Sequence, residues 1–334
     1  MTGAVLVTGA TGCLGSALTR ALVTAGERVA ILKRPGESLG RLDTIAAELD
    51  VRLGDVTDPA SLADALRGIT FVYHLAGIVI PLNSAAELMW RVNTVGSYNV
   101  ARAAKQAGVQ RLVHVSSIAS IGYPPDGVVA DESFDRRDSV AVNAYSTTKY
   151  WAERLVTDLC ADGLDVVVVN PAAVYAPGGD PRYAWSRLVE VARRGLLLAM
   201  PQGGTAVCAG GDFVDGTIKA MQRGETGRRY ILSSANVTYE TIGRHIRHAV
   251  GREGGIRRLP SAPLWALAGA NQRIARLRRD PLRSPLLVPE NVELMTRQLY
   301  YDQRRAVSEL GMSQTPADHI FRDLVNGQLM EGTR

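Results

Sequence analysis

The feature that most constrains the fold lies at the start of the chain, where an apolar run leads directly into closely spaced glycines. Residues 4–8 read Ala-Val-Leu-Val-Thr, as expected for a buried parallel strand, and Gly9-Ala-Thr-Gly12-Cys-Leu-Gly15 follows. A helix is predicted over 13–25. In such a unit Gly9 allows a tight turn, Gly12 lets the backbone approach a pyrophosphate, and Gly15 lets the helix pack on the strand. Because the free N–H groups of the helix then face the phosphates, the pattern predicts a dinucleotide site.

The end of the second predicted strand indicates which dinucleotide is bound. Residues 28–32 form this strand, and Lys33-Arg34 follow where a site for NAD(H) offers a carboxylate to the adenosine ribose. Cations at this place suit the 2′-phosphate of NADP(H). A solvated loop is the alternative for two basic residues. We predict that NADP(H) is preferred over NAD(H).

Strand and helix patterns then alternate as in a doubly wound α/β sheet. Ligands of such sheets lie beyond the carboxyl ends of the strands. Asp55 and Val56 follow one strand and are predicted to meet the adenine. Leu75-Ala76-Gly77 follow the strand 70–74 and are predicted to let the cofactor lie against the backbone. His74, a lone histidine at a buried strand end, is expected to be packed and hydrogen-bonded rather than catalytic.

A long amphipathic helix is predicted over 84–107, with Asn93 interrupting its apolar face. We expect backbone groups to satisfy the Asn93 amide, which would hold the active-site strand in place. The next strand, 111–115, ends in Ser116-Ser117. By the strand-end rule these two hydroxyls face the cofactor cleft.

A tyrosine and a lysine stand four residues apart in the following predicted helix. Tyr145 and Lys149 share one helical face, so the ammonium group is expected to favour the phenolate. A phenol made acidic in this way can exchange a proton with a carbonyl or an alcohol near neutral pH. The same spacing also occurs on ordinary solvated helices, and the surrounding motifs favour the catalytic interpretation.

Composition excludes several other classes. The chain has 334 residues, of which 46% are hydrophobic and 21% charged, as in globular enzymes. A net charge of +5 is weak evidence for nucleic acid, and no such partner is predicted. Cys13, Cys160 and Cys208 form no CxxC pair or metal cluster with the histidines, so no metal site is predicted and a cytoplasmic location is expected. We expect neither a secretory signal nor a membrane span.

Together these segments resemble a known family. The glycine triplet, the serine pair and Tyr145-x-x-x-Lys149 have the order and approximate spacing of the extended short-chain dehydrogenase/reductases, within the NAD-dependent epimerase/dehydratase superfamily. Segments 74–77, 93–96 and 170–177 also look like family segments, and the likeness runs from residue 4 to about residue 325. The chain is most similar to the dihydroflavonol-reductase-like, 3β-hydroxysteroid-dehydrogenase-like and hopanoid-associated epimerase-like group. Residues 116–122 and 130–133 carry that finer likeness.

The resemblance implies a Rossmann fold, a doubly wound parallel sheet with a smaller C-terminal substrate lobe. The NADP-binding domain is expected over 1–177, with 212–235 returning to it, and the substrate lobe over 178–211 and 236–334. It further implies that Tyr145 passes a proton, that Lys149 binds the nicotinamide ribose and lowers the tyrosine pKa, and that Ser117 hydrogen-bonds the substrate oxygen. Counting back from Gly122 selects Ser117, with Ser116 as its structural neighbour.

The resemblance also implies which residues line the two ligand sites. Cofactor contacts are expected at Gly9, Thr11, Gly12, Cys13, Leu14, Gly15, Lys33, Arg34, Asp55, Val56, Leu75, Ala76, Gly77, Val115, Tyr145, Lys149, Pro171 and Val174. Substrate contacts are expected at Val79, Ser117, Tyr123, Tyr175 and Trp185.

Two departures from the family pattern bear on the substrate. Ala176 stands where glycine is usual, which is expected to stiffen the loop under the nicotinamide. Residues 206–212, Ala-Val-Cys-Ala-Gly-Gly-Asp, are less polar than in relatives and suggest a remodelled substrate wall. The pocket wall and lid are expected over 178–211. Its candidates, for each of which packing is the simpler role, are Tyr183, Trp185, Met200 and Gly203-Gly204.

The rest of the second half is less specific. His245 and His248 are expected on a solvated helix face rather than on a metal. Residues 264–279 change from an apolar half to an Arg-rich half, for which a helix covering the pocket is the simplest interpretation. Contact with an anionic membrane or another subunit is the alternative. A homodimer through the helices that begin near Ser84 and Tyr145 is what the resemblance suggests.

Three functions follow from these observations. The first is an NADP(H)-dependent ketone reductase or alcohol dehydrogenase acting on a small hydrophobic molecule. The second is a nucleotide-sugar epimerase or dehydratase with tightly bound NAD, against which Lys33-Arg34 and the apolar Ile118-Ala119 beside Ser117 speak. The third is a regulatory protein that binds NADP without turnover, which would be expected to lack the Tyr, Lys or Ser.

Overall fold

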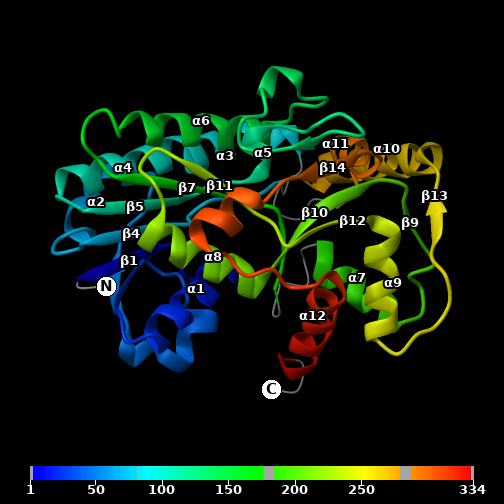
Figure 1. Cartoon of the computed structure of the whole chain (residues 1–334), viewed down its shortest axis with the longest axis horizontal. Helices are drawn as coiled ribbons and strands as arrows, with labels where there is room; N and C mark the ends of the chain where they lie inside the picture. The colour runs from blue at the N-terminus through cyan, green and yellow to red at the C-terminus, as the bar shows by residue number, and fades with distance from the viewer. Residues whose placement is uncertain (1–2, 81, 177–183, 279–286, 332–334) are drawn as a thin grey trace.

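The computed structural model describes residues 3–80, 82–176, 184–278 and 287–331 (Figure 1). Its centre is a seven-stranded sheet in the order β3-β2-β1-β4-β5-β7-β11, and every pairing along it is parallel. Its strands are β1 (Ala4–Thr8), β2 (Arg28–Lys33), β3 (Asp50–Leu53), β4 (Phe71–His74), β5 (Arg111–Val115), β7 (Val166–Pro171) and β11 (Arg229–Leu232). The chain reverses direction across the sheet between β1 and β4, so the predicted doubly wound fold is confirmed.

Helices cover both faces of this sheet (Figure 1). One face carries α2 (Pro59–Ala65), α4 (Gly96–Gln106) and α6 (Ala144–Asp158). The other carries α1 (Cys13–Thr24), α8 (Gly210–Arg223) and the 3-10 segment η1 (Gly40–Glu48). Because both faces are covered, the central strands are apolar runs rather than alternating ones, and all six residues of β7 are buried.

The long helix predicted over 84–107 is continuous in space but changes its winding. It comprises η2 (Asn83–Ala85), α3 (Ala86–Met89), a π-helical turn η3 (Trp90–Val95) and α4. Asn93, which interrupts the apolar pattern, lies inside the π-helical turn. Such turns are frequent at functional sites because they redirect side chains from the regular helical face.

The second half of the chain builds a second sheet, which the sequence analysis did not predict. Its order is β12-β10-β14-β6, with β8 also paired to β10, and a separate pair joins β9 to β13. The strands are β6 (Val129–Ala130), β8 (Ala173–Tyr175), β9 (Ala199–Pro201), β10 (Gly204–Ala209), β12 (Ala235–Thr238), β13 (Arg257–Leu259) and β14 (Gln298–Tyr301). The remaining helical segments are α5 (Ile118–Ile121), η4 (Arg136–Asp138), α7 (Ala184–Arg193), α9 (Tyr239–Ala249), α10 (Ser261–Arg278), α11 (Pro289–Met295), η6 (Ala306–Leu310) and α12 (Ala317–Glu331).

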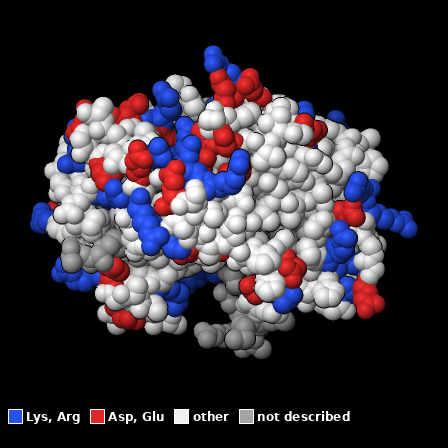
Figure 2. Space-filling model, in the orientation of Figure 1, with Lys and Arg blue, Asp and Glu red and all other residues white. Residues whose placement is uncertain are grey.

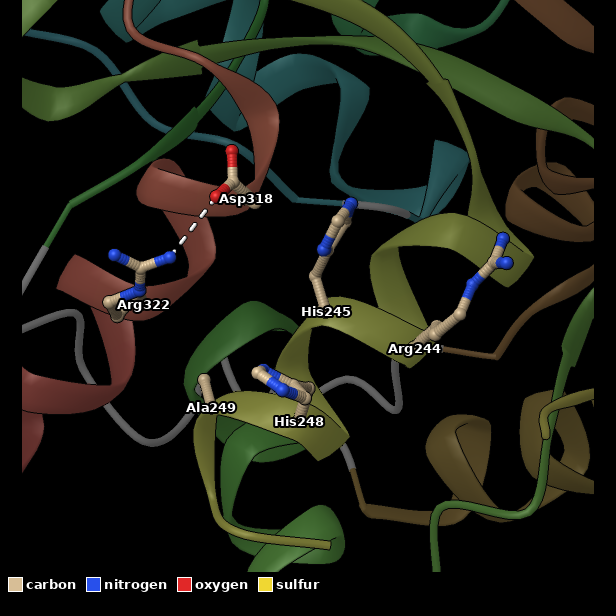
Figure 3. A pocket seen from close by; sticks show the side chains of 6 residues that line it. All are labelled: Arg244, His245, His248, Ala249, Asp318 and Arg322. Carbon is tan, nitrogen blue, oxygen red and sulfur yellow. Dashed lines mark hydrogen bonds and ion pairs between the residues drawn. The ribbon is translucent and has the colours of Figure 1, made fainter. Parts of the chain in front are cut away.

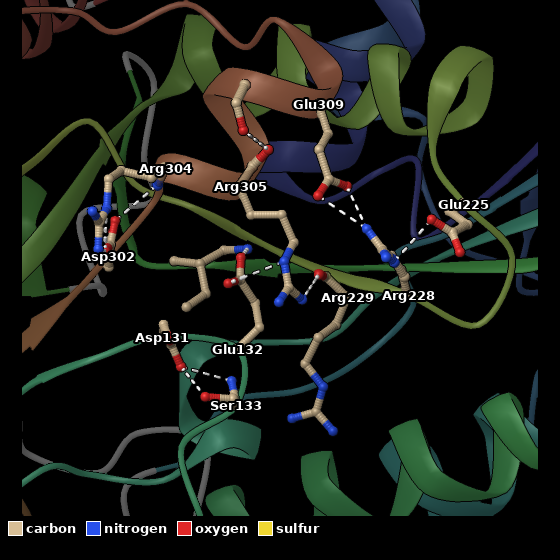
Figure 4. A network of polar contacts seen from close by, with 12 residues as sticks. Asp131, Glu132, Ser133, Glu225, Arg228, Arg229, Asp302, Arg304, Arg305 and Glu309 are labelled. Atoms are coloured by element: carbon tan, nitrogen blue, oxygen red, sulfur yellow. Dashed lines mark hydrogen bonds and ion pairs between the residues drawn. The ribbon is translucent and has the colours of Figure 1, made fainter.

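A polar network joins late segments of the chain to the central sheet (Figure 4). The buried Glu132 carboxylate accepts a hydrogen bond from the Ile231 N–H at 3.0 Å and lies 3.6 Å from the Arg305 Nε. Arg228 and Glu309 form an ion pair at 3.0 Å. Ile231 belongs to β11 and Arg228 directly precedes it. This strand is therefore held by its pairing with β7 and by the ion pair between Arg228 and Glu309 of η6.

Candidate active site

The glycine loop has the geometry that the sequence predicts. Gly9 has φ of +69°, a conformation that side chains disfavour, and a Cβ there would lie 2.7 Å from the Ala76 nitrogen. A Cβ on Gly15 would lie 2.0 Å from the Gly9 carbonyl oxygen. Both positions therefore require glycine, the first for the turn and the second for the contact between helix and strand.

The N-terminus of α1 is open to a ligand. Gly12 is the N-cap and no side chain caps the helix there. The first N–H groups of this twelve-residue helix point out of the loop, where they carry the positive end of the helix dipole. These features fit a pyrophosphate, whose oxygens would accept the hydrogen bonds that a capping side chain otherwise accepts from these N–H groups.

The adenosine end of the site contains a carboxylate that the sequence analysis missed. Glu37 accepts a hydrogen bond from the Thr11 hydroxyl at 2.8 Å and forms an ion pair with the Arg34 Nε at 3.2 Å. Burial raises the pKa of Glu37, but the hydrogen bonds from Arg34 and Thr11 outweigh burial and lower it. Arg34 therefore lies just beyond β2, as predicted, and its guanidinium group is paired with the Glu37 carboxylate. The tight turn at Gly36, with φ of +75°, brings the two together.

The two residues that the sequence predicts to meet the adenine lie just beyond the end of β3. The Asp55 carboxylate accepts hydrogen bonds from the Thr57 N–H and hydroxyl at 2.8 and 2.7 Å. Burial raises the Asp55 pKa, and these hydrogen bonds outweigh it, so the pKa is lowered and the group stays ionised. Val56 is buried, and its carbonyl accepts a hydrogen bond from the Asn99 side chain at 3.0 Å.

The serine and the tyrosine of the predicted triad lie together. Tyr145 is half-buried near the start of α6, which Asn143 and Ser146 cap reciprocally. Ser117 is the N-cap of α5, and its hydroxyl accepts a hydrogen bond from the Ala119 N–H at 3.2 Å. Burial raises the pKa of the Tyr145 phenol, and a hydrogen bond with Ser117 opposes that rise. The two hydroxyl groups therefore lie close together beyond the end of β5.

Lys149 reaches the same strand end by a different contact. It is buried, and its Nζ donates a hydrogen bond to the Val115 carbonyl at 2.8 Å. Burial lowers its pKa to about 8, and the Glu153 charge opposes this. The spacing of Tyr145 and Lys149 predicted a lowered tyrosine pKa. In this structure the tyrosine pKa is raised instead, because burial penalises the phenolate more than the hydrogen bond with Ser117 favours it.

A buried carboxylate one turn beyond Lys149 was also missed. Glu153 accepts hydrogen bonds at Oε2 from Ser116 at 2.7 Å, Ser120 at 2.6 Å and Asn170 at 2.9 Å. Its Oε1 lies 3.0 Å from the Arg229 Nε. The sequence signal was available, since Tyr145, Lys149 and Glu153 recur at intervals of four on one helical face.

This carboxylate holds the loop that carries Ser117. The Ser117 carbonyl accepts hydrogen bonds from the Ser120 hydroxyl at 2.7 Å and from the Asn170 side chain at 3.1 Å. Both donors also bond to Glu153. Ser116 is buried against Glu153, whereas Ser117 is half-buried and faces Tyr145. The two neighbouring serines therefore have different surroundings, in keeping with the roles that the resemblance gives them.

Two further polar residues have the structural roles predicted for them. The Asn93 side chain exchanges hydrogen bonds with the backbone of Ile78 at 2.8 and 2.9 Å and donates to Thr148 at 3.2 Å, so it joins the loop after β4 to α6. His74 is buried between the hydroxyls of Thr8 and Ser97 at 2.7 and 2.9 Å. Burial lowers its pKa to about 3, which keeps it neutral.

The predicted substrate residues are less uniform. Val79 is 59% exposed, whereas Tyr123 is buried and accepts a hydrogen bond from Asn143 at 3.3 Å. Tyr175 is buried, with its ring 4.9 Å from that of Phe321. Trp185 belongs to α7, but its side chain lies outside the described residues, as do Tyr183, Pro177 and the start of the predicted lid.

The small residues of 206–210 have a packing role in the structure. All six residues of β10, which ends at Ala209, are buried between β12, β14 and β8. A Cβ on Gly210 would lie 2.8 Å from the Ala176 Cβ, whereas Gly211 is exposed and has open space beside it. Asp212 is buried and bonds to Ser234, Ser313 and Thr315, so it ties α8 to the segment before α12. Close strand packing is thus one reason for the small residues that suggested a remodelled substrate wall.

The two histidines of α9 line a shallow cavity of about 330 Å³ between α9 and α12 (Figure 3). Arg244, Asp318 and Arg322 complete its rim, and Asp318 pairs with Arg322 at 3.1 Å. None of the residues predicted to bind the cofactor or to act in catalysis lines this cavity. Among the described residues no group of three or more histidine, cysteine or carboxylate side chains is placed to hold a metal ion.

Comparison with known proteins agrees with this geometry. Residues 5–233 match the model of the NAD dependent epimerase/dehydratase family. The chain belongs to this family. The match spans the glycine loop, Ser117, Tyr145 and Lys149, so the predicted extended short-chain dehydrogenase/reductase resemblance is confirmed, and the protein is an NAD(P)-dependent oxidoreductase.

Several of its relatives are similar over nearly their whole length. A Synechocystis sp. protein provisionally named dihydroflavonol 4-reductase is 30% identical over 96% of this chain and 93% of its own. Sterol demethylase protein B of Methylococcus capsulatus is 30% identical over 96% of both. A Stigmatella aurantiaca ketoreductase for a 4-farnesyl-dihydroquinoline-1-oxide is 27% identical over 91% of this chain and 90% of its own. The crystal structure of gox2253 superposes with a TM-score of 0.81 at 27% identity over 99% of both chains.

The effect of the Glu153 charge on the Lys149 pKa can be tested by substitution. Glu153→Gln removes the charge that opposes the fall of the Lys149 pKa, so that pKa should drop further below about 8. The alkaline limb of the kcat/KM profile, which reports groups of the free enzyme, should move to lower pH by roughly one unit.

Asp158→Asn, which neutralises an exposed carboxylate on the same helix, is the matched control and should leave the limb in place. Urea unfolding of each variant tests whether it is folded. An alkaline limb that stays unchanged in a folded Glu153→Gln protein would contradict the coupling to Lys149.

Proposed function

We propose that the protein is an NADP(H)-dependent ketoreductase that interconverts a carbonyl and a secondary alcohol on a small hydrophobic substrate. The observation that carries the proposal is the meeting of Ser117, Tyr145 and Lys149 beyond the carboxyl end of β5. The relatives named as reductases support the reaction class. The names of these relatives refer to a flavonoid and a farnesylated substrate, which supports a hydrophobic molecule.

Tyr145, Ser117 and Lys149 each have a different role in the proposed reaction. The nicotinamide, when bound, supplies or accepts the hydride. Tyr145 donates the proton to the substrate oxygen in the direction of reduction and takes it back in oxidation. Ser117 donates a hydrogen bond to the same oxygen and so stabilises the negative charge that develops there. Lys149, with its ammonium between the Val115 carbonyl and the ribose side of the site, holds the ribose and favours the loss of the tyrosine proton.

The raised pKa of Tyr145 suits this direction of transfer. A phenol that stays protonated at neutral pH is ready to donate to a ketone oxygen. The return of the proton in oxidation needs the phenolate, which the positive charge of Lys149 and of the nicotinamide ring would stabilise once both face the phenol. Without nucleotide, the site therefore holds the phenol in the protonated form that reduction requires.

Arg34 supports the preference for NADP(H), whereas the Lys33 ammonium donates to the Glu37 carbonyl. Arg34 is exposed just after the end of β2, where it could reach a 2′-phosphate. Its guanidinium group now forms an ion pair with the Glu37 carboxylate. On binding, a 2′-phosphate would replace the Glu37 carboxylate as the anion beside Arg34. The same Glu37 is the one observation that favours NAD(H), and with it the epimerase or dehydratase alternative, because a carboxylate there can accept hydrogen bonds from the ribose hydroxyls.

We extend the proposal to the arrangement of the chain. Residues 1–177 and 212–235 serve the cofactor, and 178–211 with 236–334 serve the substrate. The pairing of β11 with β7 and the packing of α8 beside α1 support this division, since both bring residues 210–232 back to the first sheet.

Tyr145→Phe should leave NADPH binding nearly unchanged and lower turnover roughly 100-fold or more, because the ring remains and the transferable proton does not. The measurement is steady-state reduction of the best substrate from a panel of hydrophobic ketones. Tyr150→Phe is the matched control, since Tyr150 lies on the same helix with its ring under Arg136.

A Tyr145→Phe protein that works at the parent rate would overturn the mechanism. A parent protein that reduces none of the ketones but carries NAD(H) through gel filtration would replace the proposal by the epimerase or dehydratase alternative.

The cofactor preference has its own test. Arg34→Ala should weaken NADPH binding roughly tenfold or more and leave NADH binding nearly unchanged, because only NADPH carries the 2′-phosphate. Glu37→Gln should act in the opposite sense and tighten NADPH binding several-fold. Dissociation constants from fluorescence titration of each nucleotide decide the matter, with Arg102→Ala on the exposed face of α4 as control. Equal or tighter NADH binding by the parent protein would contradict the preference.

Homodimer formation is proposed through the helices of one face. Trp90, Val95 and Trp151 are 42%, 38% and 45% exposed on η3 and α6, which pack side by side. Trp151→Glu should convert a dimer to a monomer, whereas Leu53→Glu, at a residue 58% exposed on β3, should not. Sedimentation equilibrium measures the mass of each. A monomeric parent protein at micromolar concentration would refute the dimer.

A further inference from the structure

Residues 261–272, the first two-thirds of α10, contain no charged residue, although one side of this helix is exposed. Leu264 and Ala268 are buried against Val292 of α11, and the Asn271 side chain bonds to the Leu287 carbonyl at 3.1 Å. The exposed side begins with Ala262 and Pro263 and includes Ala266 and Ala270, with no charged residue before Arg273. Its large members are Trp265, Leu267 and Ile274, which are 43%, 55% and 47% exposed. A helix fixed to the protein by one side thus presents apolar groups to solvent on the other.

The strand pair beside α10 continues this surface. β13 ends at Leu259, two residues before α10 begins, and pairs with β9. Leu196 and Leu198, just before β9, are 65% and 58% exposed, and the Leu198 carbonyl accepts a hydrogen bond from the Arg257 N–H at 2.9 Å. α10 and β13 lie together at the end of the molecule opposite α2 (Figure 1). We call the exposed side of α10 with Leu196 and Leu198 the α10 surface.

The excess of positive over negative charge in this chain comes from the segment that forms this end. Residues 244–274 contain six arginines and one glutamate, and the other 303 residues contain 32 Lys and Arg against 32 Asp and Glu. The net charge of +5 therefore comes entirely from this segment. Figure 2 shows basic side chains near the end of the molecule where Figure 1 places β13, beside a surface over α10 that is mostly uncharged.

The arginines at the rim are available for an external anion. Arg257, Arg258 and Arg273 are exposed, and Arg258 pairs with Glu240 at 2.6 Å. Among the described residues, no acidic side chain forms an ion pair with Arg257 or Arg273. Unpaired arginines around exposed leucine, isoleucine and tryptophan form the combination that binds an anionic bilayer, where the apolar groups enter the acyl boundary and the cations meet the headgroups.

We propose that the α10 surface docks the protein reversibly on an anionic lipid bilayer. None of the helices in the described part of the chain combines the length and hydropathy that crossing a bilayer requires, so the contact is peripheral. Trp265 fits the interfacial level, which tryptophan prefers because its ring is apolar and its N–H is polar. A nucleic acid would use the arginines but not the apolar side chains between them. The inference does not depend on the proposed reaction, because it rests on this surface alone.

Co-sedimentation with lipid vesicles tests the proposal on the full-length protein. The parent should bind vesicles of equal parts phosphatidylglycerol and phosphatidylcholine, bind phosphatidylcholine vesicles weakly, and lose affinity as salt is added. Leu267→Glu should weaken binding roughly tenfold or more. Arg257→Gln and Arg273→Gln should each weaken it about fivefold.

Leu53→Glu is the matched control, since Leu53 is as exposed as Leu267 but lies on β3 at the other end of the molecule. It should bind vesicles like the parent. Trp265→Phe should keep the affinity and lose most of the blue shift of tryptophan fluorescence that binding causes.

Several results would overturn the proposal. They are a parent protein that stays in the supernatant with anionic vesicles, equal losses for Leu53→Glu and Leu267→Glu, or a blue shift that persists in Trp265→Phe. Self-association of the parent that Leu267→Glu abolishes, without vesicle binding, would assign the surface to a second copy of the chain instead.

Discussion

The arrangement of the active site depends on one buried carboxylate. Glu153 receives hydrogen bonds from two serines and an asparagine and pairs with Arg229, so groups from α5, β7, β11 and the end of β5 converge on one side chain of α6. A buried charge without such partners is costly, and a fully bonded one fixes its surroundings. The contacts of Glu153 therefore fix the orientation of α6 about its own axis. In this orientation Tyr145 lies beside Ser117, and Lys149 donates to the Val115 carbonyl.

The cofactor end follows a different principle. At the glycine loop, backbone contacts leave no room for side chains at Gly9 and Gly15, and no side chain caps α1. The proposed pyrophosphate site therefore depends on sterics and on the open N-terminus of this helix. At the proposed adenosine end, Arg34 and Glu37 form an ion pair near the surface. Exposed pairs contribute little and break easily. The proposed preference for a 2′-phosphate would therefore depend on a balance between two surface charges.

The second half of the chain is held to the first by polar contacts with few alternatives. Glu132, Asp212 and Glu153 are all buried carboxylates, and each joins segments far apart in sequence. Breaking the ion pair of Glu132 or Glu153 leaves an unpaired buried charge, which destabilises more than the pair itself contributes. Removing the hydroxyl groups that donate to Asp212 would leave buried carboxylate oxygens without partners. The lobe beyond residue 236 then places α10 and β13 at the end of the molecule, where their apolar and basic side chains meet solvent rather than the cofactor.

The sequence by itself determined the parts whose signal is local. Glycine spacing, the serine pair and the Tyr145–Lys149 interval are each visible within one strand, turn or helix, and the alternation of strands and helices predicted a doubly wound sheet. Only the tertiary structure decided the order of that sheet, the pairing of β6 with β14, the four partners of Glu153, the contact of Glu37 with Arg34, and the direction of the Tyr145 pKa. The Glu37 contact spans only three residues and depends on the turn at Gly36. The other features, and the close packing of Gly9 against Ala76, depend on burial and on residues more distant along the chain, which no local period encodes.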